Sequence, residues 1–243
     1  MIIRPIAWIA LSLGLLGSAA RADDVRVVTE ETAYSYQENG QVVGSATEVV
    51  RATLRRAGLP DDRIAIYPWA RAYRLALSEP GVLIYLIART PEREMLFEWV
   101  GEIMRIDYHL YKLRERRDIE VAELDDARQY RIGVLRDDVR HAYLKAHGFT
   151  KLVVSAHNSD NFRQLINGQV DLVPMPEHDI RTLCAEHGID PARLEKVAAP
   201  SVPTRLYMAY SRQTDEATVL RTRAAFEHLQ AEGMVERTMA TEP

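Results

Sequence analysis

Aromatic and basic side chains follow one apolar run of the chain and could bind an acidic group. The stretch YPWARAY covers residues 67–73. Pro68 is expected in the first turn of a helix, where its missing N–H does no harm, so Trp69 lies at the end of the preceding strand. The N-terminus of that helix offers free N–H groups and a positive potential to an anion. Trp69 therefore either lines a pocket or packs in the core, whereas Tyr73 is expected to pack.

An arginine that could also bind an acidic group follows a second apolar run. The stretch RTPERE covers residues 89–94 and follows the apolar run VLIYLIA. Thr90 is the expected N-cap and Pro91 the first residue of a helical turn. Arg93 then lies beside the free N–H groups of that turn, and its forked guanidinium matches the two oxygens of a carboxylate.

No enzyme signature accompanies these residues. The chain lacks a G-x-S-x-G elbow, a Walker A loop and a G-x-G-x-x-G turn after a strand. Its seven histidines form no H-E-x-x-H motif. Glu177, His178 and Asp179 are adjacent in sequence and point in different directions on a helix, so neither a metal nor another cofactor is expected. The acid pair Asp137–Asp138 could hold an acid–base couple, but adjacency alone does not show it.

The first 22 residues have the layout of a cleavable secretory signal. Arg4 precedes an apolar run at 6–16, and small residues end in Ala20-Arg21-Ala22, which predicts a mature start at Asp23. A membrane anchor is the alternative, but the apolar run is shorter than the roughly 20 residues that span a bilayer. We therefore expect an exported, periplasmic protein that is soluble after cleavage. Cys184 is the only cysteine, so no internal disulfide is possible.

Charge argues against a nucleic-acid partner. The full chain has a net charge of −4, and loss of two arginines with the leader leaves 29 basic and 35 acidic residues, or −6. A nucleic-acid-binding domain is expected to be basic. The one dense basic patch, KLRERRD at 112–118, is interrupted by acids and is expected to be a solvated turn.

Short apolar runs alternate with amphipathic stretches along the mature chain, which predicts an α/β protein with mainly parallel sheets. The helix expected at 45–57 is followed by Gly58 as a C-terminal cap, and the one from Asn158 stops at Gly168. Two strand–helix series, at about 24–103 and 108–197, indicate two sheets. The strand at 206–210 and the helices after it are too few for a domain and are expected to complete the first. The expected strands are 25–28, 64–67, 82–88, 130–135, 151–154, 170–175 and 206–210.

Several of these stretches together resemble a known family, the bacterial periplasmic solute-binding proteins of the polar amino-acid uptake type (family 3). The resemblance covers essentially the whole mature chain, in particular the pair Y-P-W-x-R-A and R-T-x-x-R found in stand-alone members. It implies the type II fold of these proteins: two lobes, each a mostly parallel sheet flanked by helices, that close on a ligand. The implied division is a signal at 1–22, lobe 1 at 23–104 and 204–243, and lobe 2 at 105–203. Hinge crossings are implied near 101–107 and 197–205. The stretches that carry the resemblance are TEETAYSYQENGQVVG, YPWARAYRLAL, RTPEREMLFEWVGEI, RIGVLRDDVR and NGQVDLVPM.

The resemblance also implies roles for individual residues. Arg93 falls at the arginine that binds the ligand's α-carboxylate, and Trp69 falls near an aromatic wall. Tyr34 or Tyr36 supplies the other aromatic ring. Asp138 or Glu177 would meet the positive end of the ligand. The full set of expected ligand-binding residues is Tyr34, Tyr36, Trp69, Arg71, Tyr85, Arg89, Arg93, Arg136, Asp138 and Glu177.

The chain departs from the family pattern at two places that matter for binding. Pro176 stands where amino-acid binders have an acid for the ligand's ammonium group, with Glu177 next to it. Arg136, Asp137 and Asp138 replace the Gly-Thr or Gly-Ser turn that donates to the carboxylate, and two acids there repel an anion. The cleft could still hold a zwitterion or a cationic ligand in another arrangement, or could be empty.

We therefore expect a non-enzymatic, monomeric periplasmic protein that binds a small polar, amino-acid-like solute by lobe closure. Its partner would be an ABC permease or a sensor protein. One alternative is an enzyme on the same fold, of the cyclohexadienyl or arogenate dehydratase type, with Glu177 as its acid. Another is a ligand-free protein that acts only through a partner.

Overall fold

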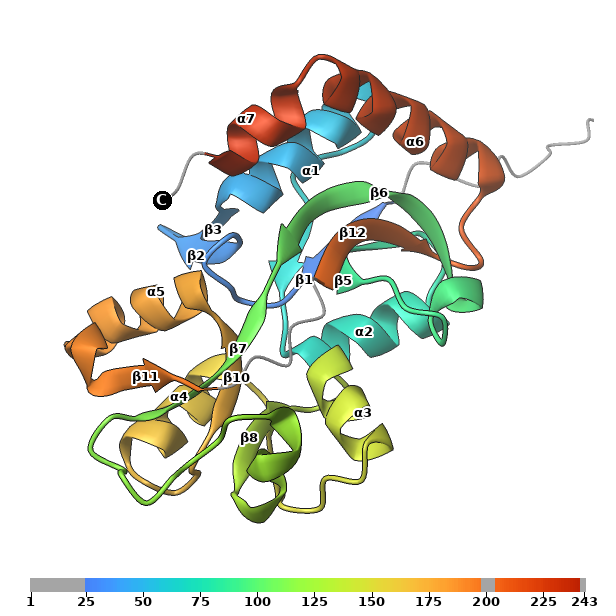
Figure 1. Cartoon of the computed structure of the whole chain (residues 1–243). Helices are drawn as coiled ribbons and strands as arrows, with labels where there is room; N and C mark the ends of the chain where they lie inside the picture. The colour runs from blue at the N-terminus through green and yellow to red at the C-terminus, as the bar shows by residue number, and fades with distance from the viewer. Residues whose placement is uncertain (1–24, 198–203, 241–243) are drawn as a thin grey trace, which may run out of the picture.

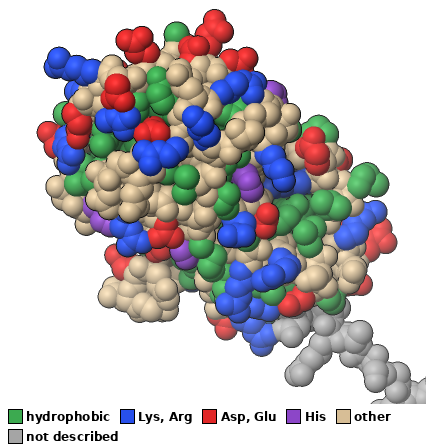
Figure 2. Space-filling view, turned by 90° about the horizontal axis from the view of Figure 1, so that it is seen from below, with side chains coloured by type: hydrophobic (Ala, Val, Ile, Leu, Met, Phe, Trp, Pro, Cys, Tyr) green, Lys and Arg blue, Asp and Glu red, His purple; other side chains and the backbone are tan. Residues whose placement is uncertain are grey.

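The computed structural model describes residues 25–197 and 204–240 (Figure 1). The predicted leader at 1–22 and most of the expected crossing at 197–205 lie outside the described residues. Within the described ranges, no helix is both long enough and apolar enough to cross a membrane. Acidic and basic side chains are interspersed over the face that Figure 2 shows, in keeping with the small net charge of the chain.

One half of the molecule is built on a five-stranded sheet. The strand order is β4-β1-β5-β12-β6; β1 pairs in parallel with β4 and β5, and β12 is antiparallel to β5 and β6. Every residue of β5 is buried because helices cover both faces of the sheet. Helices α1, α6 and α7 lie on one side and α2 on the other (Figure 1). The bounds are β1 Arg26–Thr29, β4 Ile64–Ile66, β5 Val82–Ala88, β6 Phe97–Ile106, β12 Thr204–Ser211, α1 Ser45–Arg56, α2 Trp69–Ser78, α6 Glu216–Ala231 and α7 Met234–Ala240.

The other half is built on shorter strands. β7 pairs antiparallel with β10 and β11, β8 pairs in parallel with β9, and a bridge from Ile132 to Leu172 links the two sets. A hairpin of β2 and β3 and three short 3-10 helices complete the described structure. The bounds in this half are β7 Tyr108–Leu113, β8 Ile132–Leu135, β9 Leu152–Ser155, β10 Val173–Pro176, β11 Leu194–Lys196, α3 Val139–Ala146, α4 Asn158–Ile166, α5 Glu177–His187, η2 Leu124–Gln129 and η3 Pro191–Arg193. The remaining elements precede the crossing at Asp107 and are β2 Tyr36–Glu38, β3 Gln41–Val43 and η1 Glu94–Leu96.

The predicted α/β class is confirmed, and each of the seven expected strands exists within a few residues of its predicted position. β6 and β7 were missed. The sequence of β6, FEWVGEIMRI, mixes buried and half-exposed residues, so it contains no continuous apolar run. β6 ends at Ile106 and β7 begins at Tyr108, so Asp107 alone joins the two halves at this crossing. The predicted crossing near 101–107 therefore lies within one continuous, extended segment that runs from β6 into β7 (Figure 1).

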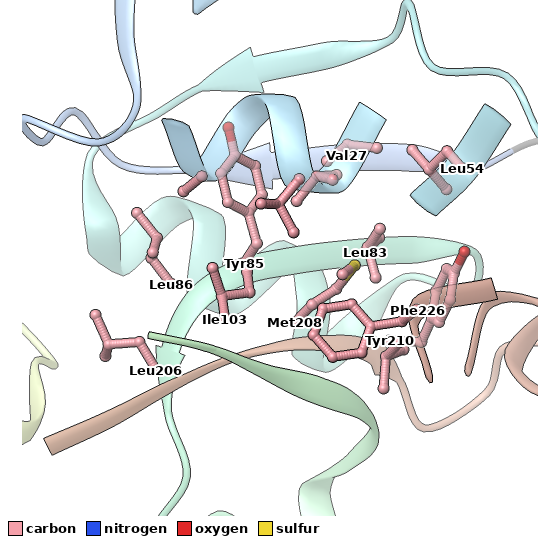
Figure 3. Close-up of a cluster of buried hydrophobic side chains, with 14 of the residues drawn as sticks. Val27, Leu54, Leu83, Tyr85, Leu86, Ile103, Leu206, Met208, Tyr210 and Phe226 are labelled. Carbon is pink, nitrogen blue, oxygen red and sulfur yellow. The ribbon is translucent and has the colours of Figure 1, made fainter. Parts of the chain in front are cut away.

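The core of the first half closes against a glycine in β6. Phe226 of α6 is buried with Leu83, Met208 and Tyr210 of the sheet (Figure 3). A Cβ atom added at Gly101 would lie 2.1 Å from a ring carbon of Phe226. The ring can therefore pack against β6 only because position 101 has no side chain.

Substitution of Gly101 by alanine tests this packing. Gly101→Ala is expected to lower the free energy of unfolding by about 1 to 3 kcal/mol, because it overfills a packed site. Urea denaturation monitored by circular dichroism measures the change. In a Phe226→Leu background the ring is gone, so adding Gly101→Ala should cost less stability than it does in the parent chain. Equal stability of Gly101→Ala and the parent chain would contradict the packing argument.

Candidate functional site

A small cavity of about 30 Å³ lies where the two halves of the molecule meet. Its volume holds about one water molecule. The first half contributes residues of α2, β5, β6 and β12 and of the loops after β1 and β5, and the second half contributes residues of β7, β10, α3, α4 and α5, so both halves form walls. The charged side chains that line it are Glu30, Arg93, Asp138, Arg140 and Asp179.

Arg93 is buried, with 7% of its surface exposed. Its guanidinium donates hydrogen bonds to the carbonyl oxygens of Ala88, at 3.3 Å, and of Asp137, at 3.1 Å. The rings of Trp69 and Tyr73 lie 5.6 and 4.8 Å from the guanidinium carbon. Arg93 therefore points into the junction of the halves, and both of these hydrogen bonds go to backbone carbonyl oxygens rather than to a carboxylate.

The backbone carbonyl of Asp137, in the second half, accepts hydrogen bonds from two side chains of the first half. Trp69 Nε1 donates to it at 3.0 Å, beside the hydrogen bond from Arg93. Asp137 has φ of +58°, a left-handed conformation that aspartate tolerates better than most residues. This conformation lets Asp138 cap α3 by accepting from the N–H of Arg140 at 2.9 Å. The Arg-Asp-Asp segment thus retains a tight turn where the family pattern has Gly-Thr or Gly-Ser.

Arg140 adds a second buried guanidinium to the cavity. It forms an ion pair with Asp138, donates to the carbonyl of Pro174 at 2.9 Å and reaches Asn158 at 3.3 Å. Its guanidinium also stacks over the ring of Tyr108, 4.7 Å from the ring centre. Burial alone would raise the pKa of Asp138, but the charge and hydrogen bonds of Arg140 outweigh it and hold the pKa below its usual value. This ion pair is therefore neutral as a unit.

At two further carboxyl groups of the cavity, Glu30 and Asp179, burial outweighs the charge of Arg140. Burial, reinforced by the charge of Asp138, raises the pKa of Glu30 to about 8. Burial also raises the pKa of Asp179, although the Ala33 N–H donates to that carboxyl. Asp179 Oδ1 is buried without a hydrogen-bond partner among the described residues. Asn158 Nδ2 donates a long hydrogen bond to Glu30 Oε2, at 3.5 Å. Burial thus favours the protonated, uncharged form of both carboxyl groups as long as no further cation lies beside them.

Four of the ten predicted site residues line this cavity: Tyr34, Trp69, Arg93 and Asp138. The ring of Tyr34 also lies 5.0 Å from that of His178 in the other half. Either Tyr34 or Tyr36 was expected to supply the second aromatic ring of the site. Tyr34 lines the cavity, whereas Tyr36 pairs with Val43 in the β2–β3 hairpin.

The structure places the remaining predicted residues elsewhere. Tyr85 is fully buried in the first core, where its hydroxyl bonds to Ser35 and Thr47 and burial raises its pKa to about 12. It does not line the cavity, although Leu86 and Ala88 of the same strand do. Glu177 lies at the surface in ion pairs with Lys196 and Arg181, which keep its pKa below the usual value. It is Asp179, two residues further along α5, that faces the cavity. Arg71, Arg89 and Arg136 line an outer groove instead.

Sequence reasoning missed Glu30, Arg140 and Asp179. Glu30 directly follows β1, which is parallel to β4 and β5, so its position at the shared carboxyl edge could have been inferred. Arg140 and Asp179 lie in the first turns of helices α3 and α5, and their direction depends on how each helix packs. No local signal distinguishes them from their neighbours.

The arrangement suits recognition better than bond making. Two arginines and three carboxyl groups converge on a largely buried space, where charge pairing is stronger than in bulk water because the local dielectric is low. Among the described residues, no group of three or more histidine, cysteine, aspartate or glutamate side chains could hold a metal ion. The cavity offers donors to an acid group at Arg93 and acceptors to a cation at Glu30 and Asp179.

Comparison with known proteins adds a fold relationship. No protein-family model and no curated protein sequence matches the chain. A histidine kinase sensor domain with similarity to periplasmic binding proteins matches it with a TM-score of 0.78 and 19% identity, over 91% of this chain and 96% of that one. A mutant of ArgBP from T. maritima matches with a TM-score of 0.77 and 14% identity, over 90% of this chain and 94% of that one.

The arginine-, lysine-, histidine-binding protein ArtJ from Geobacillus stearothermophilus is also similar. It has a TM-score of 0.75 and 17% identity to this chain, over 90% of this chain and 96% of its own. At such identities the likeness shows the fold. The chain therefore has the two-lobed α/β fold of the solute-binding proteins of amino-acid ABC transporters.

Proposed function

We propose that this protein binds a small polar solute between its two lobes, and that the solute carries both an acid group and a positive charge. The observation that carries this proposal is the convergence of Arg93, Glu30 and Asp179 on one cavity walled by both halves. A buried charge is retained only where a partner compensates it. A solute with both charges would supply the partner that these groups lack.

The acid end of the solute would bind Arg93. In the closed structure this guanidinium donates only to backbone carbonyl oxygens. A carboxylate is a stronger acceptor for a guanidinium than a neutral carbonyl. Trp69 and Tyr34 would flank the apolar part of the solute.

The positive end would bind Glu30 and Asp179. An ammonium or guanidinium group would give Asp179 Oδ1 its missing partner and would stabilise Glu30 in its ionised form. Because the pKa of Glu30 is about 8 without a cation, binding near neutral pH should release a proton.

Solute entry requires the halves to separate. The closed cavity of about 30 Å³ is far below the roughly 300 Å³ at which small-molecule pockets begin. The direct link through Asp107 and the crossing near 197–205 would form the hinge. We propose the lobe boundaries accordingly, with 23–104 and 204–243 in lobe 1 and 105–203 in lobe 2.

The predicted leader supports a periplasmic location. There the closed form would be read by an ABC permease or by a sensor protein, since ligand binding shifts the population toward closure. A substrate-binding protein of an amino acid ABC transporter and a histidine kinase sensor domain are both among the similar structures.

One observation favours a second candidate, a ligand-free protein that acts only through a partner. The lobes already contact each other directly, through the Asp137 carbonyl, through Asn158 and Glu30, and through the rings of Tyr34 and His178. Such contacts could hold the closed form without a solute. The dehydratase alternative has no comparable support, because Glu177, the acid it needs, lies outside the cavity in surface ion pairs.

Calorimetric titration with amino acids, short peptides and polyamines tests the solute site. A solute that binds the parent chain should bind Arg93→Gln more weakly by about 2 to 4 kcal/mol, because a charge-assisted contact to the carboxylate is lost. Arg89→Gln is the matched control, since Arg89 pairs with Glu94 at 2.8 Å outside the cavity. Absence of binding by every member of the panel, with no metabolite retained in native mass spectrometry, would remove the main support for the proposal.

The pH dependence of stability tests the environment of Glu30. Its pKa in the folded protein, about 8, exceeds the ordinary value of 4.5, so the folded state binds the proton more tightly than the unfolded state. Stability should therefore fall as the pH rises from about 4.5 to about 8. Thermal unfolding of Glu30→Gln should lack this component, whereas the exposed neighbour Glu31→Gln should retain it. An identical pH profile for Glu30→Gln and the parent would show that Glu30 is not buried with other charges.

Small-angle X-ray scattering separates the two candidates. A solute-binding protein should have a larger radius of gyration without solute and contract when the solute from the titration panel is added. A radius that matches the closed structure in solute-free protein, and that no panel member changes, would favour the ligand-free candidate.

A further inference from the structure

A groove of about 1440 Å³ lies outside the charged cavity, along the mouth of the junction between the lobes. One wall is α2 with the segment at 89–96, and the other is α3 with the preceding turn. The groove adjoins the cavity. Five residues line both: Ala88, Arg93, Tyr108, Val139 and Arg140. Its size exceeds what a single amino-acid-like solute needs.

The groove collects exposed apolar side chains. The described part of the chain has six exposed large hydrophobic residues, and three of them, Leu77, Leu96 and Tyr143, line this groove. A fourth, Met95, is 73% exposed and adjoins Leu96 in sequence. Single exposed apolar residues are ordinary, but a cluster of them in a concavity marks a binding surface. Hydrophobic and basic side chains also lie side by side on the face that Figure 2 shows.

The rim of the groove is basic, although the chain as a whole is acidic. Seven arginines line it against two acids, Glu92 and Asp137, while the net charge of the chain is −4. Four of the seven are buried or in ion pairs, namely Arg89, Arg93, Arg140 and Arg205, so the basic character of the rim rests on the other three. Arg71 stacks on the ring of Tyr67 at 4.3 Å, and the side chains of Arg74 and Arg136 are exposed. None of these three arginines has an ion-pair partner among the described residues. Their positive charge is therefore available to a partner.

We propose that this groove docks an acidic, amphipathic segment of a partner protein, with apolar side chains on Leu77, Leu96 and Tyr143 and carboxylates on the surrounding arginines. Charge complementarity selects this occupant. The chain's own predicted leader contains two arginines and no acid, so it does not fit the basic rim. The concave shape suits an inserted polypeptide segment better than a flat bilayer surface.

Docking at this groove would depend on lobe closure. The two walls come from different lobes, and the hydrogen bonds from Trp69 and Arg93 to the Asp137 carbonyl hold them together at its base. Separation of the lobes would divide the apolar residues of α2 from those of α3. The partner segment would thus distinguish closed from open protein without contacting a bound solute, whether or not a solute causes closure.

Fluorescence anisotropy with a designed peptide pair tests the proposal. The probe is a labelled helical peptide with leucine on one face and glutamate on the other, and its matched peptide carries lysine at every glutamate position. The glutamate peptide should bind the full chain, and added salt should weaken it. Arg74→Glu and Arg136→Glu should each weaken binding by roughly fivefold or more, since each replaces an attraction by a repulsion. Leu96→Ser should also weaken it, and circular dichroism would confirm that each exposed-site variant is folded.

The matched control is Arg117→Glu, which reverses an exposed arginine outside the groove and should bind like the parent. Absence of glutamate-peptide binding, equal binding of both peptides, or an equal loss in the control would overturn the proposal. Two further results would assign the groove to another occupant. One is Arg74- and Arg136-dependent binding to phosphatidylglycerol vesicles with no peptide binding, and the other is Leu96-dependent self-association in sedimentation equilibrium.

Discussion

The backbone carbonyl of Asp137 is the contact on which the arrangement of the two halves depends. It accepts hydrogen bonds from Trp69 and Arg93, the two residues that the first half directs at the junction. A left-handed turn at Asp137 presents this carbonyl and leaves Asp138 free to cap α3. One residue conformation thus positions the junction, the helix and the ion pair with Arg140 together. Both the charged cavity and the outer groove exist because these lobes meet here.

Charge inside the junction is only partly balanced. The Asp138–Arg140 pair is neutral and well bonded, whereas Glu30 and Asp179 share their burial with no cation of their own. Ionising such buried carboxyl groups costs free energy unless a partner compensates the charge. That imbalance is the physical reason for treating the cavity as a binding site for a solute with a positive group. It also explains why such a site need not contain the acid at position 176 that the family pattern has.

The fold could be predicted well, and the site only in part. Apolar runs identified the buried strands because parallel strands covered on both faces lack polar residues. Strands β6 and β7 were not predicted because their polar and apolar residues are mixed, as in the β6 sequence FEWVGEIMRI. Trp69 and Arg93 could be placed at strand ends from their spacing. Tyr85 could not be excluded, because the face of a strand that a side chain occupies depends on the register of its neighbours.

By itself, the sequence determined the succession of strands and helices, the acidic net charge, the single cysteine and the position of Arg93 after a buried strand. These features follow from local spacing and composition. Tertiary structure decided that Asp179 rather than Glu177 faces the junction, that Arg140 neutralises Asp138, and that exposed apolar residues from α2 and α3 line one groove. Such contacts join residues distant in the chain, and their geometry exists only after the two lobes have packed together.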